Sequence, residues 1–572
     1  MASTNIQPRY PHFQEAYQRH RKIFDSALLR PLEPVLPPGL DQAQFDRAIV
    51  ELVKQLGADS VFVGEALRDY IDPFEIWELE GQRRIPSAAL QPRSVAEVQS
   101  VLKIANDFKL PLWTFSQGKN FGYGGPAPIV NGSVALDLHR LNNIIKVDDD
   151  LCYAVVEPGV SFKDMYDYCV KNDLKVWPSG PSLPWGSMIG NTLDRGMGFL
   201  PTGIHHQHIA GLEVLLADGE LIRTGLFAIN DSESAHVSKH SFGPSIEGLF
   251  IQSNLGIVTK MGMWLTPRPQ SYMYCKLDMP ERDDIKTIVD TLGPLRRNGV
   301  IDSTVWGTSA TETIAMQYKR AEAWKGEGPI PDWRLKELMS EFNIGFWTTH
   351  FGLYGPEEVI KAHFEEVKKV VAEKAPTGRL TGNLYSGKGA ELLGGQGLND
   401  GDPDLFINRP GFQAMEILKF NLPLDDSGSV SAHRDFAPVM PAIGTTVQDW
   451  VQTSREICEA EGFDLFCDFF VQERSVIFIY LTTFDKADPK HREVLHKIMT
   501  RFHEEARKRK FAAYRTHILD MDRNAQAFDF NNHAYRRFVE TLKDTLDPEG
   551  ILSPGKQGIW PQKYRDGKVD RQ

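Results

Sequence analysis

The feature that most restricts the fold of this chain is a short apolar strand that runs directly into a glycine-rich loop. The strand covers Leu110–Phe115, and residues 116–125 read Ser-Gln-Gly-Lys-Asn-Phe-Gly-Tyr-Gly-Gly. Glycines let successive backbone N–H groups converge on an anion, so a loop in this position suits a pyrophosphate. The spacing fits neither GxxxxGK[ST] nor GxGxxG, which argues against a nucleoside triphosphatase and a Rossmann NAD site. Taken alone, the loop could equally be a structural turn.

The sequence on both sides of this loop predicts mixed helices and strands. Before it, Ser94 and Glu97 form a capping-box pattern at the start of an amphipathic helix that ends near Phe108. After it, Asp218-Gly219 marks a hairpin turn between two β-rich runs. From about residue 275 the pattern changes to long amphipathic helices, 356–373 and 446–461, separated by strands 466–471 and 476–481. We therefore predict an α+β fold with a second domain, and a mobile glycine-rich loop over 387–404.

Length and composition narrow the possible partners. The 572 residues carry 64 Lys and Arg against 76 Asp and Glu, a net charge of −12, without a polybasic run. Nucleic acid and membrane surfaces are therefore not expected partners. The five cysteines include no CxxC pair, which favours a reducing compartment over a disulfide framework or zinc cluster. We find neither a signal-peptide core nor a long apolar run, so we expect an intracellular, cytoplasmic location.

Two further glycine-rich tracts, residues 185–198 and 253–259, follow the first one. Together with two motifs near the C-terminus they give five patterns in a fixed order. These are SxGxNxGYGG at 116–125, GSxxGNxxxRGxG at 186–198, QSNxGIVTKxGxWL at 252–265, YRTH at 514–517 and PGKxGxWP at 554–561. In this combination the chain resembles the vanillyl-alcohol oxidase and p-cresol methylhydroxylase family of flavoproteins over residues 45–563.

The resemblance implies FAD as the cofactor, with the first loop at its pyrophosphate. The residues that it assigns to the cofactor are Ser116, Gly118, Lys119, Asn120, Phe121, Gly122, Ser187, Gly190, Asn191, Asn254, Gly256, Ile257 and Val258. Lys556 would supply a cation for the reduced flavin, the alternative being a surface lysine. The implied division is an N-terminal arm over 1–45, an FAD-binding domain over 46–275, a substrate cap over 276–499, and a segment over 500–565 that completes the FAD-binding domain.

His433 matches the histidine that bonds covalently to the flavin 8α-methyl carbon in some family members. A neutral imidazole nitrogen is a competent nucleophile, and the bond would raise the oxidising power of the flavin. In vanillyl-alcohol oxidase a histidine after an Asp-Pro pair assists this reaction, whereas here Asp72-Pro73 is followed by Phe74. The alternative for His433 is a hydrogen bond to a non-covalent flavin.

Tyr123, Tyr514 and Arg515 match the positions where this family holds the oxygen of a para-substituted phenol. A phenol must lose its proton before its para carbon can give up hydride, and hydroxyl donors with a guanidinium stabilise the phenolate. The alternative is a core tyrosine beside a surface ion pair. The resemblance therefore implies oxidation of 4-alkylphenols, 4-hydroxybenzyl alcohols or ethers through a p-quinone methide.

The position of one carboxylate differs from the vanillyl-alcohol oxidase pattern. Ile204 stands where that enzyme carries an aspartate near flavin N5, while Asp468 fits a carboxylate that the p-cresol methylhydroxylase branch has on the opposite wall. Phe466 and Phe470 would share a strand face with Asp468, so burial could raise its pKa into the range of a general base. The alternative is a hydrogen-bonded structural aspartate.

Other readings remain open at this point. His205, His206 and His208 are too close in sequence to bind one metal ion together, and we expect no metal site. The rival functions are an FAD enzyme that oxidises a sugar or other non-phenolic alcohol, and a catalytically silent flavin-binding assembly protein. Dioxygen or another acceptor would take the electrons, and a homodimer or larger homo-oligomer is expected.

Overall fold

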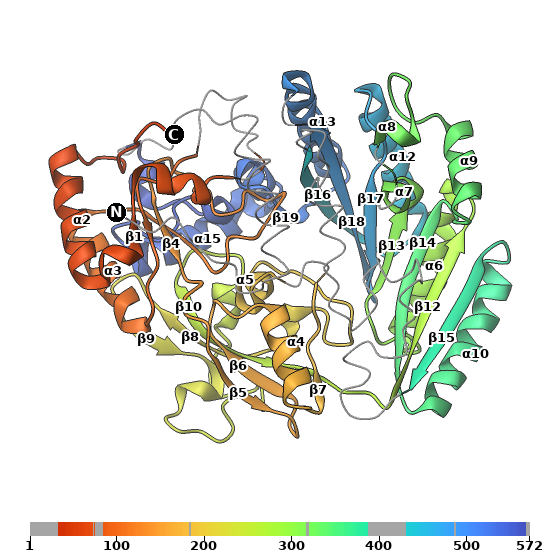
Figure 1. Ribbon diagram of the computed structural model, residues 1–572, viewed down its shortest axis with the longest axis horizontal. Helices are drawn as coiled ribbons and strands as arrows, with labels where there is room; N and C mark the ends of the chain where they lie inside the picture. The colour runs from red at the N-terminus through yellow and green to blue at the C-terminus, as the bar shows by residue number, and fades with distance from the viewer. Residues whose placement is uncertain are drawn as a thin grey trace.

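The computed structural model describes residues 32–72, 74, 84–181, 185–315, 318, 320–386, 431–485 and 488–567. The loop expected at 387–404 and most of the expected N-terminal arm lie outside this part of the chain. Figure 1 shows the described elements in two lobes, each built on its own sheets, which we call the first and the second lobe. The described residues contain no helix with the length and apolar character needed to cross a membrane.

The first lobe contains a four-stranded sheet and a five-stranded sheet. The strand orders are β1-β2-β4-β3 and β5-β6-β10-β8-β9, and β7 pairs with β11 in a small separate sheet. The strands are β1 (Val61–Phe62), β2 (Ala89–Leu90), β3 (Leu112–Phe115), β4 (Val134–Asp137), β5 (Ile144–Asp148), β6 (Tyr153–Val156), β7 (Val176–Trp177), β8 (Ile209–Leu215), β9 (Leu221–Arg223), β10 (Ile257–Trp264) and β11 (Thr266–Pro267). The helices are α2 (Gln42–Leu56), α3 (Val95–Phe108), α4 (Phe162–Lys171) and α5 (Met188–Leu193), joined by α14 (Met521–Ala525), α15 (Phe530–Leu546) and α16 (Gln562–Arg565) from late in the sequence.

Helix α3 leads into β3 and the glycine loop, as the sequence predicts. At its N-terminus, only one of the two hydrogen bonds of the expected capping box forms. The Ser94 hydroxyl accepts a hydrogen bond from Glu97 N at 3.2 Å, but the Glu97 carboxylate accepts from Arg93 N instead of the Ser94 backbone. The helix is still capped, because either arrangement satisfies an N–H group that has no partner inside a helix.

The second lobe is built on an eight-stranded sheet of order β15-β12-β14-β13-β17-β18-β16-β19. Its strands are β12 (Ser271–Met279), β13 (Val305–Ser309), β14 (Trp347–Gly355), β15 (Arg379–Ser386), β16 (Ser431–Pro441), β17 (Cys467–Val471), β18 (Ser475–Asp485) and β19 (Ala513–Thr516). The helices of this lobe are α6 (Ile285–Arg297), α7 (Ala310–Ala315), α8 (Arg320–Ala323), α9 (Asp332–Glu341), α10 (Glu357–Lys374), α12 (Gly444–Ala460) and α13 (Pro489–Lys508). Helices α6, α10, α12 and α13 pack on strands of this sheet.

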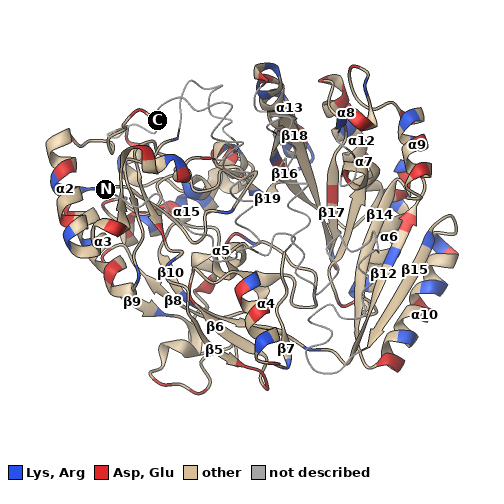
Figure 2. Cartoon of the chain, in the orientation of Figure 1, with Lys and Arg blue, Asp and Glu red and all other residues tan. Residues whose placement is uncertain are grey.

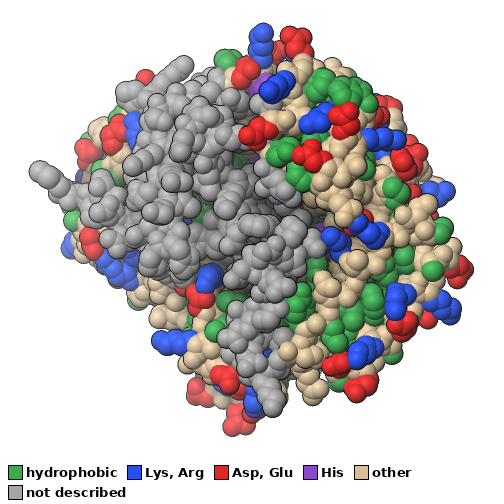
Figure 3. All heavy atoms as spheres, turned by 45° about the vertical axis from the view of Figure 1, so that its right-hand side comes forward, with side chains coloured by type: hydrophobic (Ala, Val, Ile, Leu, Met, Phe, Trp, Pro, Cys, Tyr) green, Lys and Arg blue, Asp and Glu red, His purple; other side chains and the backbone are tan. Residues whose placement is uncertain are grey.

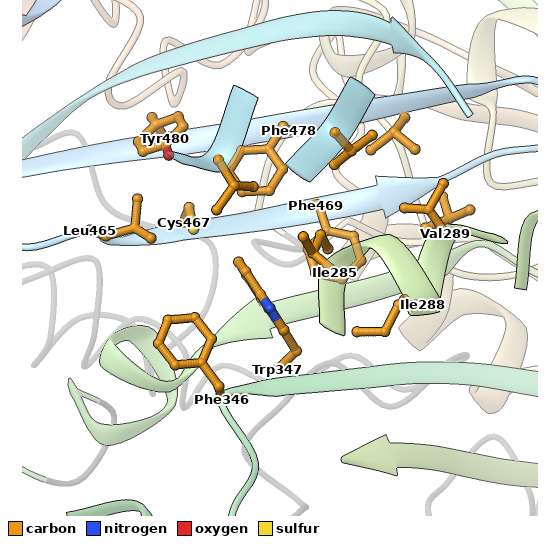
Figure 4. Close-up of a cluster of buried hydrophobic side chains, with 14 of the residues drawn as sticks. Ile285, Ile288, Val289, Phe346, Trp347, Leu465, Cys467, Phe469, Phe478 and Tyr480 are labelled. Carbon is orange, nitrogen blue, oxygen red and sulfur yellow. The ribbon is translucent and has the colours of Figure 1, made fainter. Parts of the chain in front are cut away.

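The two faces of the eight-stranded sheet bury different residues. Phe469 on β17 and Phe478 on β18 stack on each other and meet Trp347 of β14 edge-on, in the core under the helices that Figure 4 shows. Phe470, next to Phe469, belongs to another cluster with Trp306 and Phe199. This alternation follows from the period of two along a strand. The second face therefore faces away from the helices and carries its own set of side chains.

Charged residues lie mainly on the outer helices. Figure 2 shows acidic and basic residues interspersed along α9 and α10, while the strands beneath them are mostly uncharged. In the view of Figure 3, the described part of the surface likewise mixes both signs with small hydrophobic areas. The amphipathic pattern that predicted α10 therefore corresponds to a charged outer side and a buried inner side.

Candidate active site

The three glycine-rich tracts meet around one pocket. Twelve of the residues that the sequence assigned to the cofactor line it. They are Ser116, Gly118, Lys119, Asn120, Ser187, Gly190, Asn191, Asn254, Gly256, Ile257, Val258 and Lys556. Tyr123 and Arg515 line the same pocket, whereas Phe121, Gly122 and His433 are not part of its wall.

Close backbone approach explains two of the glycines. A Cβ atom on Gly190 would lie 2.2 Å from the Ser116 hydroxyl oxygen, so only glycine lets α5 approach the first loop this closely. Gly122 has a φ of +76°, and a Cβ there would lie 2.7 Å from the His433 ring. Glycine avoids both the left-handed strain and the clash at this position. The glycine spacing is therefore needed for the contacts around the pocket.

The far end of the chain completes the pocket wall. Leu552 forms a parallel bridge with Leu112, and the Ser553 hydroxyl accepts a hydrogen bond from Thr114 N at 3.1 Å. The fully buried Lys543 ammonium donates to the backbone oxygens of Asn254 and Leu552, each at 2.7 Å. Residues more than four hundred positions apart are thereby fixed side by side.

Polar atoms without partners show that the pocket wall fits a ligand with several polar groups. Thr114 Oγ1, Asn254 Oδ1 and Arg515 Nε are buried and have no hydrogen-bond partner among the described residues. All three residues line the pocket. Because buried polar groups are almost always paired in native proteins, these atoms fit hydrogen bonds to a bound cofactor or substrate. The Lys556 ammonium lies 6.0 Å from the Trp113 ring centroid in the same wall.

The predicted phenol-binding side chains lie together, with Tyr123 and Arg515 in the pocket wall and Tyr514 next to Arg515 outside that wall. The Arg515 guanidinium carbon lies 3.9 Å from the Tyr123 ring centroid and 5.7 Å from that of Tyr514. Burial raises the pKa of Tyr123 well above its usual range, and the charge of Arg515 opposes that rise. Gln252 Nε2 donates to the Tyr514 backbone oxygen at 2.7 Å, which ties β19 to the third glycine tract. The cluster thus joins two phenols and one permanent cation.

Asp468 lies on the face of the eight-stranded sheet that turns away from the helices. Trp306 Nε1 donates to Asp468 Oδ2 at 3.3 Å, and the second oxygen, Oδ1, is buried without a partner among the described residues. Phe466, Phe470 and Tyr514 pack in the same cluster as Trp306, which confirms the predicted apolar surroundings. Burial raises the pKa of Asp468 to about 8, although the Trp306 N–H group opposes this rise. Asp468 also acts on the phenol of Tyr514 through its charge.

His433 lies behind the glycine loop and makes one hydrogen bond. Its Nδ1 atom is 2.6 Å from Asp435 Oδ1, and its buried Nε2 atom has no partner among the described residues. The His433 and Phe74 rings meet edge-on with centroids 5.0 Å apart. Phe121 packs on Phe74, at 5.6 Å between ring centroids. Gly122 therefore borders the histidine, and Phe121 borders Phe74, while neither lines the pocket.

Sequence reasoning missed two carboxylates near Asp468. Glu312 on α7 is 3% exposed, and its Oε2 atom has no partner among the described residues. Burial raises the pKa of Glu312 well above its usual range, and the charges of Asp468 and Asp435 add to this effect. Asp435 follows His433 by two positions, so a predicted strand over 431–441 would have placed both on one face. Nothing in the local sequence around Glu312 indicates its burial.

The histidine tract 205–208 has a structural role at its first residue. His205 Nδ1 and Asn191 Oδ1 are 2.7 Å apart, as are His205 Nε2 and the Ser179 backbone oxygen. Both ring nitrogens are thus engaged, and burial lowers the pKa of His205 to about 3. Ile204 forms a bridge with Met197, a member of the aromatic cluster around Trp306. The residue that replaces the expected aspartate therefore lies beside that apolar cluster.

Comparison with known proteins places this architecture in a class. Residues 86–225 match the family described as "FAD binding domain", and residues 442–557 match "FAD linked oxidases, C-terminal domain". The chain belongs to this family of FAD-linked oxidoreductases and is an enzyme of that class. The predicted α+β fold with two domains and the predicted FAD cofactor are thereby confirmed.

Particular relatives match over nearly the whole chain. The "4-cresol dehydrogenase [hydroxylating] flavoprotein subunit" of Pseudomonas putida is 33% identical over 530 residues, 92% of this chain and 98% of the relative. A solved structure of 4-ethylphenol oxidase from Gulosibacter chungangensis, in complex with isoeugenol, is 33% identical with a TM-score of 0.86. It covers 92% of this chain and 100% of its own. Substrate-bound p-cresol methylhydroxylase is 32% identical with a TM-score of 0.83, covering 92% of this chain and 99% of its own.

Proposed function

We propose that this enzyme oxidises phenols that carry an alkyl, hydroxymethyl or ether substituent para to the hydroxyl group. The observation that carries the proposal is the position of Arg515 in the wall of the FAD pocket, against Tyr123 of the same wall and beside Tyr514. The names of the relatives, which act on 4-cresol and 4-ethylphenol, support the same substrate class. They also support the resemblance to the vanillyl-alcohol oxidase and p-cresol methylhydroxylase branch.

In this proposal the arginine and tyrosines hold the substrate as a phenolate. The guanidinium of Arg515 keeps its charge at every accessible pH, and its Nε–H group is free of protein partners among the described residues. A charge-assisted hydrogen bond from such a group contributes about 1.5–3 kcal/mol. Ionisation of the phenol makes loss of hydride from the benzylic carbon favourable and leads to a p-quinone methide. Bound FAD supplies the two-electron acceptor for that hydride.

Asp468 would act on the second half of the reaction. Its Oδ1 atom has no protein partner among the described residues, while Trp306 holds Oδ2. A carboxylate in this state can take a proton from the water that attacks the quinone methide. The products are then an alcohol or an aldehyde, or an alkene where a proton is lost instead. Dioxygen or another acceptor would finally reoxidise the enzyme, and a homo-oligomer is expected.

His433 is proposed to bond covalently to the 8α-methyl carbon of FAD. The support is its unpartnered Nε2 atom and its contact with Gly122 in the first loop. Acid precipitation of FAD-loaded protein should leave flavin fluorescence in the pellet. His433→Ala should release the flavin into the supernatant but still bind FAD, because His433 is outside the pocket wall.

Anaerobic addition of substrates tests the function. We expect 4-alkylphenols to bleach the flavin absorbance, and the matched 4-alkylanisoles, which cannot form a phenolate, to leave it unchanged. Bleaching by sugars or non-phenolic alcohols alone would favour the first rival function. Tight binding of phenols with no bleaching by any compound would favour a silent flavin-binding protein. Equal rates with a phenol and its anisole would show that the three side chains do not bind a phenolate.

A further inference from the structure

The contact between His433 and Asp435 fixes which nitrogen of the imidazole carries a proton. The two residues lie two positions apart on β16, so both side chains are on one face of the sheet. Nδ1 lies 2.6 Å from the Asp435 carboxylate. Both residues are buried, with 8% of the surface of His433 and 5% of that of Asp435 exposed. Because a carboxylate only accepts hydrogen bonds, Nδ1 carries the proton and Nε2 keeps its lone pair.

The first glycine loop holds this pair in place. A Cβ atom on Gly122 would lie 2.7 Å from His433 Nδ1 and 3.0 Å from Asp435 Oδ2. The Asp435 backbone N–H donates to the Gly122 oxygen at 3.5 Å. The loop that lines the FAD pocket at Asn120 and Tyr123 therefore rests directly on the histidine and its carboxylate.

Among the described residues, the ring that packs against the histidine cannot accept a proton. The Phe74 ring meets the imidazole edge-on, with ring centroids 5.0 Å apart, and it is purely apolar. Arg434, between the two residues in sequence, is paired with Asp520. The Asp435 carboxylate is thus the group in contact with the ring that can stabilise a positive charge on it.

We propose that Asp435 is the positioning residue that enables His433 to bond to FAD, an inference that rests on the covalent link proposed above. The Nε2 lone pair forms the bond to the 8α-methyl carbon, and one C–H bond of that methyl group breaks. The methyl proton leaves to solvent, and the electron pair of the bond enters the flavin ring, which also takes up one proton. The carbon is oxidised, and the ring is reduced by two electrons that pass to dioxygen or another two-electron acceptor.

Asp435 contributes to this step at both of its stages. Before the bond forms, the carboxylate orients the ring and makes Nε2 a stronger nucleophile by accepting the Nδ1 hydrogen bond. After the bond forms, the imidazole is alkylated at Nε2 and protonated at Nδ1, so it is a cation. The buried Asp435 carboxylate, 2.6 Å away, stabilises that cation.

The test uses Asp435→Asn, which keeps an oxygen acceptor for the Nδ1–H group but removes the negative charge. Flavin-depleted wild type and variant are loaded with FAD, and the bonded fraction is followed over time by intact mass and by fluorescence of the acid-precipitated protein. We expect bond formation to slow by at least about tenfold, within the range for losing a group that orients a ligating or catalytic histidine. Total FAD bound should be equal, because Asp435 is outside the pocket wall.

Two further variants separate charge from structural damage. Asp435→Glu keeps the charge and should bond FAD faster than Asp435→Asn, while Asp278→Asn removes a buried carboxyl from β12 of the same lobe and should bond FAD at the wild-type rate. If Asp435→Asn does not fold, Asp435→Ser supplies the neutral comparison. Bonding of the neutral variant at the wild-type rate, or no faster bonding by Asp435→Glu, overturns the inference alone. Complete release of FAD from the wild type by acid overturns the covalent link as well.

Discussion

The wall of the FAD pocket and the face of the eight-stranded sheet that turns away from the helices differ in the kinds of groups that form them. The pocket wall depends on glycines, backbone groups and the permanent cation of Arg515. The sheet face depends on ionisable side chains, such as His433, Asp435 and Asp468, of which the first two are buried. Steric changes should therefore act on the pocket at every pH, whereas changes on the sheet face should appear in pH profiles and in bond formation. The following predictions test this division.

The largest effect is expected where the two regions touch, at Gly122. An alanine there would combine a positive φ with contacts of 2.7 Å to His433, and we expect a loss of about 2–4 kcal/mol in stability. Gly219→Ala is the matched control, because its φ is +89° but nothing lies within 4 Å of a Cβ there. It should cost about 1 kcal/mol. Denaturant unfolding of both variants measures the difference, and equal losses would show that crowding against His433 is unimportant.

Arg515→Ala should weaken binding of phenolic inhibitors by about 10- to 100-fold, because a buried phenolate loses its charge-assisted donor. FAD content should stay near the wild-type level. Titration of the flavin spectrum with a non-reducible phenol gives the affinity, and the O-methylated compound serves as the control. If both compounds lose affinity to the same extent, Arg515 supports the pocket structure and does not bind the phenolate.

Asp468→Asn should slow hydroxylation by at least about tenfold, or shift products towards the alkene, because the general base is lost. A base acts only when deprotonated. Because burial raises the pKa of Asp468 to about 8, wild-type hydroxylation should increase as the pH rises towards 8 and beyond. The variant should lose this dependence. A pH profile that is unchanged by the substitution would exclude Asp468 as the base.

Trp306→Phe should give the smallest effect. The indole N–H group, 3.3 Å from Asp468 Oδ2, stabilises the carboxylate and lowers its pKa. Its loss should move the midpoint of the hydroxylation profile to higher pH, by up to about one unit. A carboxyl whose pKa is raised in the folded protein makes stability fall as the pH rises towards that pKa, so the fall should continue to higher pH in the variant. A shift to lower pH would contradict the assigned hydrogen bond.

The same contrast explains what the sequence could predict. The glycine tracts and the C-terminal motifs are local patterns, and the family resemblance that they carry implied twelve residues of the pocket wall. The alternation around Asp468 is a local pattern too, and it predicted the shared face of Phe466 and Phe470. Glu312 and Asp468, in contrast, come close only because β13 pairs with β17, and no local pattern encodes that pairing. The reciprocal half of the capping box also failed, because the Glu97 side chain bonds Arg93 N instead. Whether a polar side chain is buried depends on partners far away in the sequence.

The β-bridge between Leu112 and Leu552 has a consequence for folding during synthesis. Domains commonly fold from the N-terminus while the ribosome is still at work, but this pocket cannot close in that order. Its first strand would wait for Leu552, Ser553 and Lys556, which are translated more than four hundred residues later. Cofactor capture thus becomes a late event in biogenesis, and partly synthesised chains would have no means to hold FAD.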